Sequence, residues 1–210
     1  MDEDDGYDEI GDTQMEVPTA SPEQSEQRKK CRELRRLFFE TNWAIQCLKI
    51  VGEIERTCSE LREGFLVFAY RSLWNDALAS LMRVFDETRD AFSLWKIDKL
   101  DDVCQAAEID IATLREFSTR LRTARSKVHF HIDKRYAADS DELWAEVDIK
   151  ESEMLQAANN AAKILGHLLS TDYLFPANLS RYDASDVRPI LEHLHTRGLG
   201  NMRMRDRSTK

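Results

Sequence analysis

The stretch FLVFAYRSLWNDALASLMRVFD, residues 65–86, is the most hydrophobic helical pattern in this chain of 210 residues. Its apolar side chains recur every three or four residues, the period of a helix with one buried face: Leu66, Ala69, Tyr70, Leu73, Ala77, Leu81 and Val84. A second flank is also apolar, with Phe65, Phe68, Leu78, Met82 and Phe85. We therefore expect a helix over about residues 61–88 in the middle of a bundle or a dimer.

The polar residues of this helix form a narrow stripe that contains Ser72, Asp76, Arg83 and Asp86. Helical spacing predicts that Arg83 pairs with Asp86 or Glu87. The stripe is interpreted as a solvated or interface face, and the alternative is that it contributes to a functional site.

Similar patterns predict three more long helices. One covers about residues 23–60, with Ser21 as its N-cap and Pro22 in its first turn. Another begins near Ile111 after a possible cap, Asp110, and the last covers about residues 151–170. Glycine and proline are scarce, at 7 and 4 residues, and no strand pairs stand out. The sequence therefore predicts an all-α bundle of four to five helices.

Charge divides the chain into a body and two tails. Residues 1–27 hold ten acids and no lysine or arginine, residues 201–210 carry a net charge of +3, and the body between them is near −2. We predict a disordered acidic tail over 1–22, a single helical domain over 23–200 and a basic tail over 201–210. The acidic tail either solvates the protein or covers a basic site until nucleic acid displaces it. The body has no global basic field, so any contact with RNA must be local.

The four cysteines, Cys31, Cys47, Cys58 and Cys104, form no CxxC pair and have no histidine at ligand-like spacing. They are interpreted as free thiols in a reducing cytosol, not as a zinc site, and we expect no metal and no cofactor. The acidic N-terminus does not resemble a signal peptide, and no apolar run has the length of a membrane span. These features predict a cytoplasmic protein with no membrane partner.

The candidate site lies in the sequence RSKVHFHIDK, residues 125–134, where an arginine, two histidines and a carboxylate come together. Arginine can hold a phosphate by a planar set of donors, and histidine can exchange protons near neutral pH. On a continuous helix Arg125 and His129 share a face, whereas Arg125 and His131 differ by about 120°. Arg125 and His131 therefore converge only if the helix ends or unwinds near His131, or across a dimer. The plain alternative is a helix end with solvated charges.

This stretch resembles the motif of the HEPN superfamily, an arginine followed after four to six residues by a histidine. It looks most like the AbiU-type branch linked to phage abortive infection, and the preceding LMRVFD, residues 81–86, is similar to the end of that branch's second helix. The resemblance covers about residues 30–172. In this chain Ser126 stands where asparagine or aspartate is commoner, and His129 stands where a small apolar residue is usual.

The resemblance implies a HEPN-like bundle that dimerises, so that two motifs face each other across a cleft. It further implies a metal-independent endoribonuclease that acts in phage defence or as a toxin. Arg125 and His131 would be catalytic, and the residues that would support them or contact RNA are Ser126, Lys127, His129 and Asp133. The RNA 2′-hydroxyl would be the nucleophile, and a 2′,3′-cyclic phosphate the product.

Two alternatives to a ribonuclease remain open at this point. One is an inactive HEPN module that binds RNA or a nucleotide, and the other is a helical protein-interaction scaffold. His129 either substitutes for His131 in the site or merely packs. A possible partner is an antitoxin or a nucleotidyltransferase that covers or modifies the site.

Overall fold

Helices make up the regular structure of the protein. The structure, a computed structural model, describes residues 21–57, 65–126, 148–172 and 182–196. Within these ranges there is no strand, which confirms the all-α prediction for this part of the chain. The helices are α1 (Pro22–Thr57), α2 (Phe65–Val84), α3 (Leu100–Ala106), α4 (Ile111–Ala124), α6 (Glu151–Asp172) and α7 (Arg188–Thr196), with a 3₁₀ turn at Leu94–Lys96. Neither predicted tail can be assessed, because residues 1–20 and 197–210 lie outside the described ranges.

Helix α1 begins where the sequence predicts. The Ser21 hydroxyl accepts a hydrogen bond from the backbone N–H of Gln24 at 3.2 Å, and the Gln24 side chain accepts one from the N–H of Ser21 at 3.1 Å. This reciprocal pair is a capping box, and Pro22 follows it in the first turn, where a missing N–H costs nothing. The helix then continues for 36 residues. At 1.5 Å per residue its length is about 54 Å.

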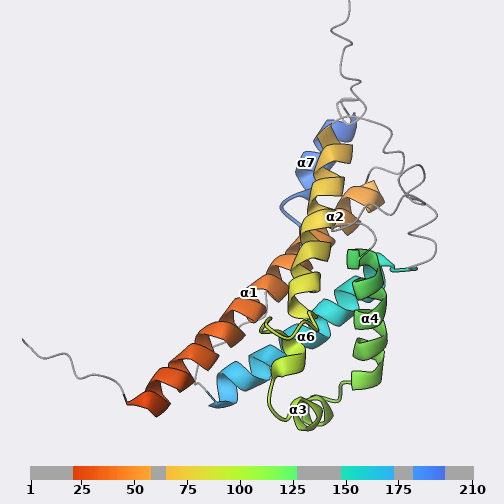
Figure 1. Cartoon of the computed structure of the whole chain (residues 1–210). Coiled ribbons are helices and arrows are strands. Elements are labelled where there is room, and N and C mark those ends of the chain that lie inside the picture. The colour runs from red at the N-terminus through yellow and green to blue at the C-terminus, as the bar shows by residue number, and fades with distance from the viewer. Residues whose placement is uncertain (1–20, 58–64, 127–147, 173–181, 197–210) are drawn as a thin grey trace, which may run out of the picture.

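Helices α1, α2 and α6 form the centre of the bundle. Figure 1 shows α2, in yellow, alongside the C-terminal half of α1, and α6, in cyan, packed across both. The residues with the largest fully buried side chains include Leu48, Leu78, Leu81, Ile164 and Leu165. Four alanines of α6 (Ala157, Ala158, Ala161 and Ala162) are also buried in this core. Small side chains at these positions let neighbouring helices approach closely.

The second apolar flank of α2 is only partly covered, contrary to the sequence pattern. Leu78, Met82 and Phe85, toward the C-terminal end, are buried as expected. Phe65 and Phe68, at the N-terminal end, are 72% and 69% exposed. Periodicity identifies an apolar flank, but burial depends on whether another helix reaches it. Among the described helices, none covers this end of the flank.

Ion pairs attach the outer helices to the centre. Glu53 of α1 is buried, and its carboxylate accepts from Arg188 of α7 at 2.6 Å and from Arg56 on the next turn of α1. The hydrogen bond from Arg188, followed by that from Arg56, holds the pKa of Glu53 below its ordinary value. Arg120 of α4 pairs with Glu153 of α6 at 3.0 Å. Helix α4, which ends at the candidate site, is thereby fixed to the core.

Two further findings concern the cysteines and membrane insertion. Cys31, Cys47 and Cys104 are free thiols, as predicted, while Cys58 lies outside the described residues. Among the described helices, none combines the length and apolar character needed to cross a bilayer.

A pair of carboxyl groups joins α1 to the start of α6. Glu151 approaches α1 at Gly52, where a Cβ atom would lie 2.7 Å from its Oε1, so a larger residue at position 52 would displace the end of the Glu151 side chain. Glu151 shares a hydrogen bond with Glu55, and Glu55 accepts another from the Tyr70 hydroxyl at 2.6 Å. Burial, and then the nearby Glu55 carboxylate, raise the pKa of Glu151 to about 7.

We expect Glu151→Gln to stabilise the protein at pH 8 and to change its stability little at pH 4. The folded-state pKa lies above the ordinary value of 4.5, so the wild type loses stability as pH rises from about 4.5 through 7. Glutamine imitates the protonated carboxyl and removes that loss. The gain at pH 8 should be about 1–2 kcal/mol after screening by solvent. Thermal unfolding at both pH values checks this, and equal shifts at both would contradict it.

Candidate functional site

Asp110 begins the helix that carries the candidate arginine. Its carboxylate accepts a hydrogen bond from the backbone N–H of Ala112 at 2.9 Å, as the predicted cap should. The buried face of α4 consists of Leu114, Phe117, Ser118, Leu121 and Ala124, which recur at the three- and four-residue spacing of an amphipathic helix. Arg125 and Ser126 continue α4 as a wider π turn. Such turns are frequent at functional sites.

Arg125 is held by an acid from the end of α2. Its Nη1 lies 2.6 Å from Oδ2 of Asp86, and the two side chains are 30% and 12% exposed. The same carboxylate accepts from the backbone N–H of Thr88 at 2.9 Å. Burial alone would raise the pKa of Asp86, but the Thr88 N–H and the Arg125 guanidinium outweigh it and hold that pKa below its ordinary value. Asp86 is therefore ionised at neutral pH and fixes the arginine.

The turn after α2 is anchored so that Asp86 keeps this position. The backbone oxygen of Phe85 accepts from the Trp95 indole at 3.1 Å and from the Ser118 hydroxyl at 3.3 Å. The Phe85 ring packs against the rings of Trp95 and Phe117, with centroids 5.9 and 5.6 Å away. These contacts tie the end of α2 to α4, and they limit the movement of Asp86 relative to Arg125.

A second arginine–carboxylate pair lies beside the first. Arg122, one turn before Arg125, pairs with Glu87 at 2.6 Å. Together the two pairs border a cavity of about 490 Å³, which is lined by Met82, Phe85, Asp86, Glu87, Thr88, Ser118, Leu121, Arg122, Arg125 and Ser126. The four charges at this cavity sum to zero. A guanidinium presents its N–H donors in a planar arrangement that suits phosphate oxygens as well as carboxylates.

The structure brings together part of the predicted site. Arg125 and Ser126 line the cavity, and the Ser126 hydroxyl donates to the backbone oxygen of Thr123 at 3.0 Å. Four other predicted site residues lie outside the described residues: Lys127, His129, His131 and Asp133.

The predicted pairing of Arg83 with Asp86 or Glu87 is wrong. Arg83 pairs with Glu40 of α1 at 2.6 Å, while Asp86 and Glu87 pair with Arg125 and Arg122. Within α2 the interval from Arg83 to Asp86 suits a pair, but the helix ends at Val84 and the chain turns toward α4. The residues that sequence reasoning missed at the site are Asp86 and Glu87 as partners of the α4 arginines. The available signal was the acidic pair Asp86-Glu87 directly after an apolar helix.

Comparisons with models of protein families, with curated proteins and with solved structures found no match to this chain. The resemblance of residues 81–86 and 125–134 to the HEPN superfamily therefore stays a hypothesis.

Proposed function

We propose that this protein is a metal-independent endoribonuclease of the HEPN type, acting in phage defence or as a toxin, whose site centres on Arg125 and His131. The observation that carries the proposal is the ion pair of Arg125 with Asp86 on the wall of a cavity. An arginine fixed in advance beside a cavity can stabilise charge that develops on a bound phosphate. It also stands at the start of the motif that continues to His131.

The chemistry needs no external nucleophile. The 2′-oxygen of RNA attacks the adjacent phosphorus, and the bond from phosphorus to the 5′-oxygen breaks. One His131 accepts the proton from the 2′-hydroxyl, and the same histidine of a second copy donates a proton to the departing 5′-oxygen. Arg125 stabilises the negative charge on the phosphorus oxygens. The products are a 2′,3′-cyclic phosphate and a 5′-hydroxyl, so atoms and protons balance.

Replacing Arg125 by alanine is expected to slow RNA cleavage in EDTA by roughly 100- to 1000-fold, the usual cost of removing one donor to a charged transition state. Arg122→Ala is the matched control. Like Arg125, Arg122 lines the cavity and pairs with a carboxylate. Unlike Arg125, it lies outside the motif. We expect the control to slow cleavage less than about tenfold, because a flanking phosphate contact is a weaker contribution. Equal rates for wild type and Arg125→Ala would contradict the proposal.

A further inference from the structure

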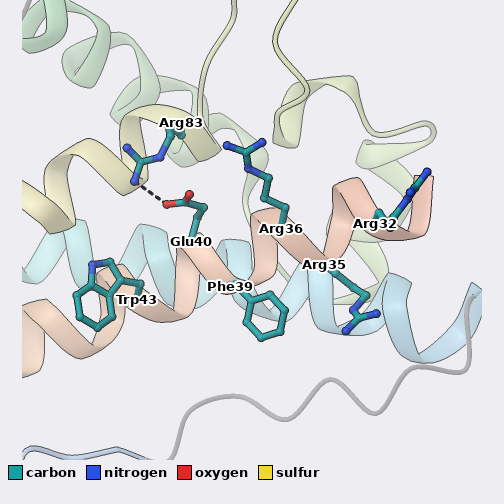
Figure 2. Close-up of a pocket in the computed structure, with 7 residues that line it drawn as sticks. All are labelled: Arg32, Arg35, Arg36, Phe39, Glu40, Trp43 and Arg83. Atoms are coloured by element: carbon teal, nitrogen blue, oxygen red, sulfur yellow. Dashed lines mark hydrogen bonds and ion pairs between the residues drawn. The ribbon is translucent and has the colours of Figure 1, made fainter. Parts of the chain in front are cut away.

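A second cavity lies between α1 and the C-terminal end of α2, and it shares no lining residue with the cavity at Arg125. It has a volume of about 600 Å³ and is lined by Arg32, Arg35, Arg36, Phe39, Glu40 and Trp43 of α1 with Arg83 of α2. Figure 2 shows these side chains along one stretch of α1, with Arg83 reaching over from α2 to Glu40. We call the α1 residues Arg32, Arg35, Arg36, Phe39 and Trp43 the arginine–aromatic face.

The face follows the helical repeat. Arg28, Arg32, Arg35, Phe39 and Trp43 recur at intervals of three and four residues, so they share one side of α1. Arg28 and Arg32 also line an adjoining hollow, which extends this side toward the start of the helix. From Arg28 to Trp43 the side is about 22 Å long at 1.5 Å per residue.

The aromatic rings on this face are exposed. Phe39 is 59% and Trp43 is 47% exposed. Single exposed apolar side chains are ordinary and need no explanation. Here two aromatic rings stand one turn apart and continue a row of arginines, which is the composition of surfaces that stack bases and hold phosphates.

Charge on this face is unbalanced. The face carries three arginines (Arg32, Arg35 and Arg36) and no acid, and the one acid that lines its cavity, Glu40, already pairs with Arg83. Among the described residues, Arg32 and Arg36 have no carboxylate within ion-pair distance. They stand four residues apart on α1, where like charges repel each other. A bound polyanion would relieve that repulsion.

We propose that the arginine–aromatic face binds single-stranded RNA without sequence preference. Arg32, Arg35 and Arg36 contact backbone phosphates, and unpaired bases stack on Phe39 and Trp43. A duplex hides its base faces, so the aromatic rings favour a single strand. The choice of RNA over DNA rests on the proposed ribonuclease function, whereas binding at this face does not depend on cleavage.

A second copy of the chain fits this face less well. A two-fold symmetric interface uses the same patch of both copies, so the arginines of one copy would lie against those of the other and repel them. The hollow that leads from Arg36 and Arg83 toward Asp86 is also lined by Glu33 and Asp90. Its acids disfavour a phosphate backbone, so we treat the arginine–aromatic face as a binding site separate from the cavity at Arg125.

The test is the affinity of the full chain for a labelled RNA of about ten nucleotides without secondary structure, a length within the range of single-strand sites. Arg32→Glu/Arg36→Glu should weaken binding at least tenfold and reduce the slope of log affinity against log salt by about 1.4, because each lost phosphate contact removes roughly 0.7. The matched control is Arg71→Glu/Lys163→Glu, which changes net charge equally at exposed residues that do not line the cavity. It should bind nearly as wild type does.

Variants of Phe39 separate stacking from apolar docking. Phe39→Leu keeps an apolar side chain but should weaken binding, within the roughly 5- to 150-fold range for loss of one stacked base, while Phe39→Trp should restore it. Repeating the comparison in the Arg125→Ala background keeps the two proposals distinguishable, since that background should cleave poorly while Arg32→Glu/Arg36→Glu should still weaken its binding to RNA. Equal affinities for the two double variants would overturn the inference. So would dissociation of a dimer by Arg32→Glu/Arg36→Glu with unchanged RNA affinity, which would make the face a contact between copies.

Discussion

Alanine in place of His131 is expected to slow RNA cleavage by roughly 100- to 10,000-fold, the usual contribution of a positioned general acid or base. The loss should be large because a dimer uses the same residue twice, once as the base at the 2′-oxygen and once as the acid at the 5′-oxygen. The expectation rests on the match of Arg125 and His131 to the two ends of the motif. Single-turnover cleavage of a labelled RNA in EDTA measures it.

The matched control is His129→Ala, two residues earlier in the same motif. We expect its cleavage rate to stay within about tenfold of the wild type, since a residue that packs or contacts flanking RNA contributes less than the acid or base itself. Melting temperatures of both variants show whether either has lost its fold. A larger loss for His129→Ala than for His131→Ala would contradict the alignment to the motif and assign the chemistry to His129.

Leu81→Ala is expected to lower the free energy of unfolding by about 3–5 kcal/mol, the cost of a cavity in a well-packed core. Leu81 is 0% exposed and belongs to the main core cluster, near the end of α2 that leads to Asp86. Phe68→Ala removes a larger apolar side chain from the same helix, but Phe68 is mostly solvent-exposed. Its cost should stay within about 0.5 kcal/mol, as for most surface positions.

Urea unfolding, monitored by circular dichroism, compares the two α2 variants under one condition. The midpoint should fall strongly for Leu81→Ala and hardly at all for Phe68→Ala. Equal shifts would mean that the described burial of α2 is wrong. A strong shift for Phe68→Ala alone would mean that Phe68 is covered in solution, for example by a second copy of the chain.

The long helices are predictable because their information is local. Ser21 with Gln24 and Asp110 with Ala112 cap the helices that they precede, and apolar spacing identifies α2, α4 and α6. Which apolar residues become buried is not local. Phe65 and Phe68 continue an apolar flank of α2, yet no described helix lies over them. Burial there depends on how helices far apart in the sequence pack, which periodicity does not contain.

The candidate site was likewise predictable only where its information is local. Arg125 and the LMRVFD segment could be singled out from the sequence, but their partners could not. Local spacing pairs Arg83 with Asp86, whereas the bundle places Arg83 beside Glu40 and Asp86 beside Arg125. Net charge does not reveal the arginine–aromatic face, because the body of the chain is nearly neutral as a whole. The spacing of Arg28, Arg32, Arg35, Phe39 and Trp43 was the signal that could have identified it.

The most direct test of the central claim is the chemical identity of the RNA ends left by wild-type protein in EDTA. We predict 2′,3′-cyclic phosphates with 5′-hydroxyls from the wild type, and no such ends from Arg125→Ala/His131→Ala protein prepared identically. Cleavage that requires Mg²⁺ and leaves 5′-phosphates, or equal amounts of cyclic phosphate from both proteins, would contradict a metal-independent ribonuclease centred on Arg125 and His131.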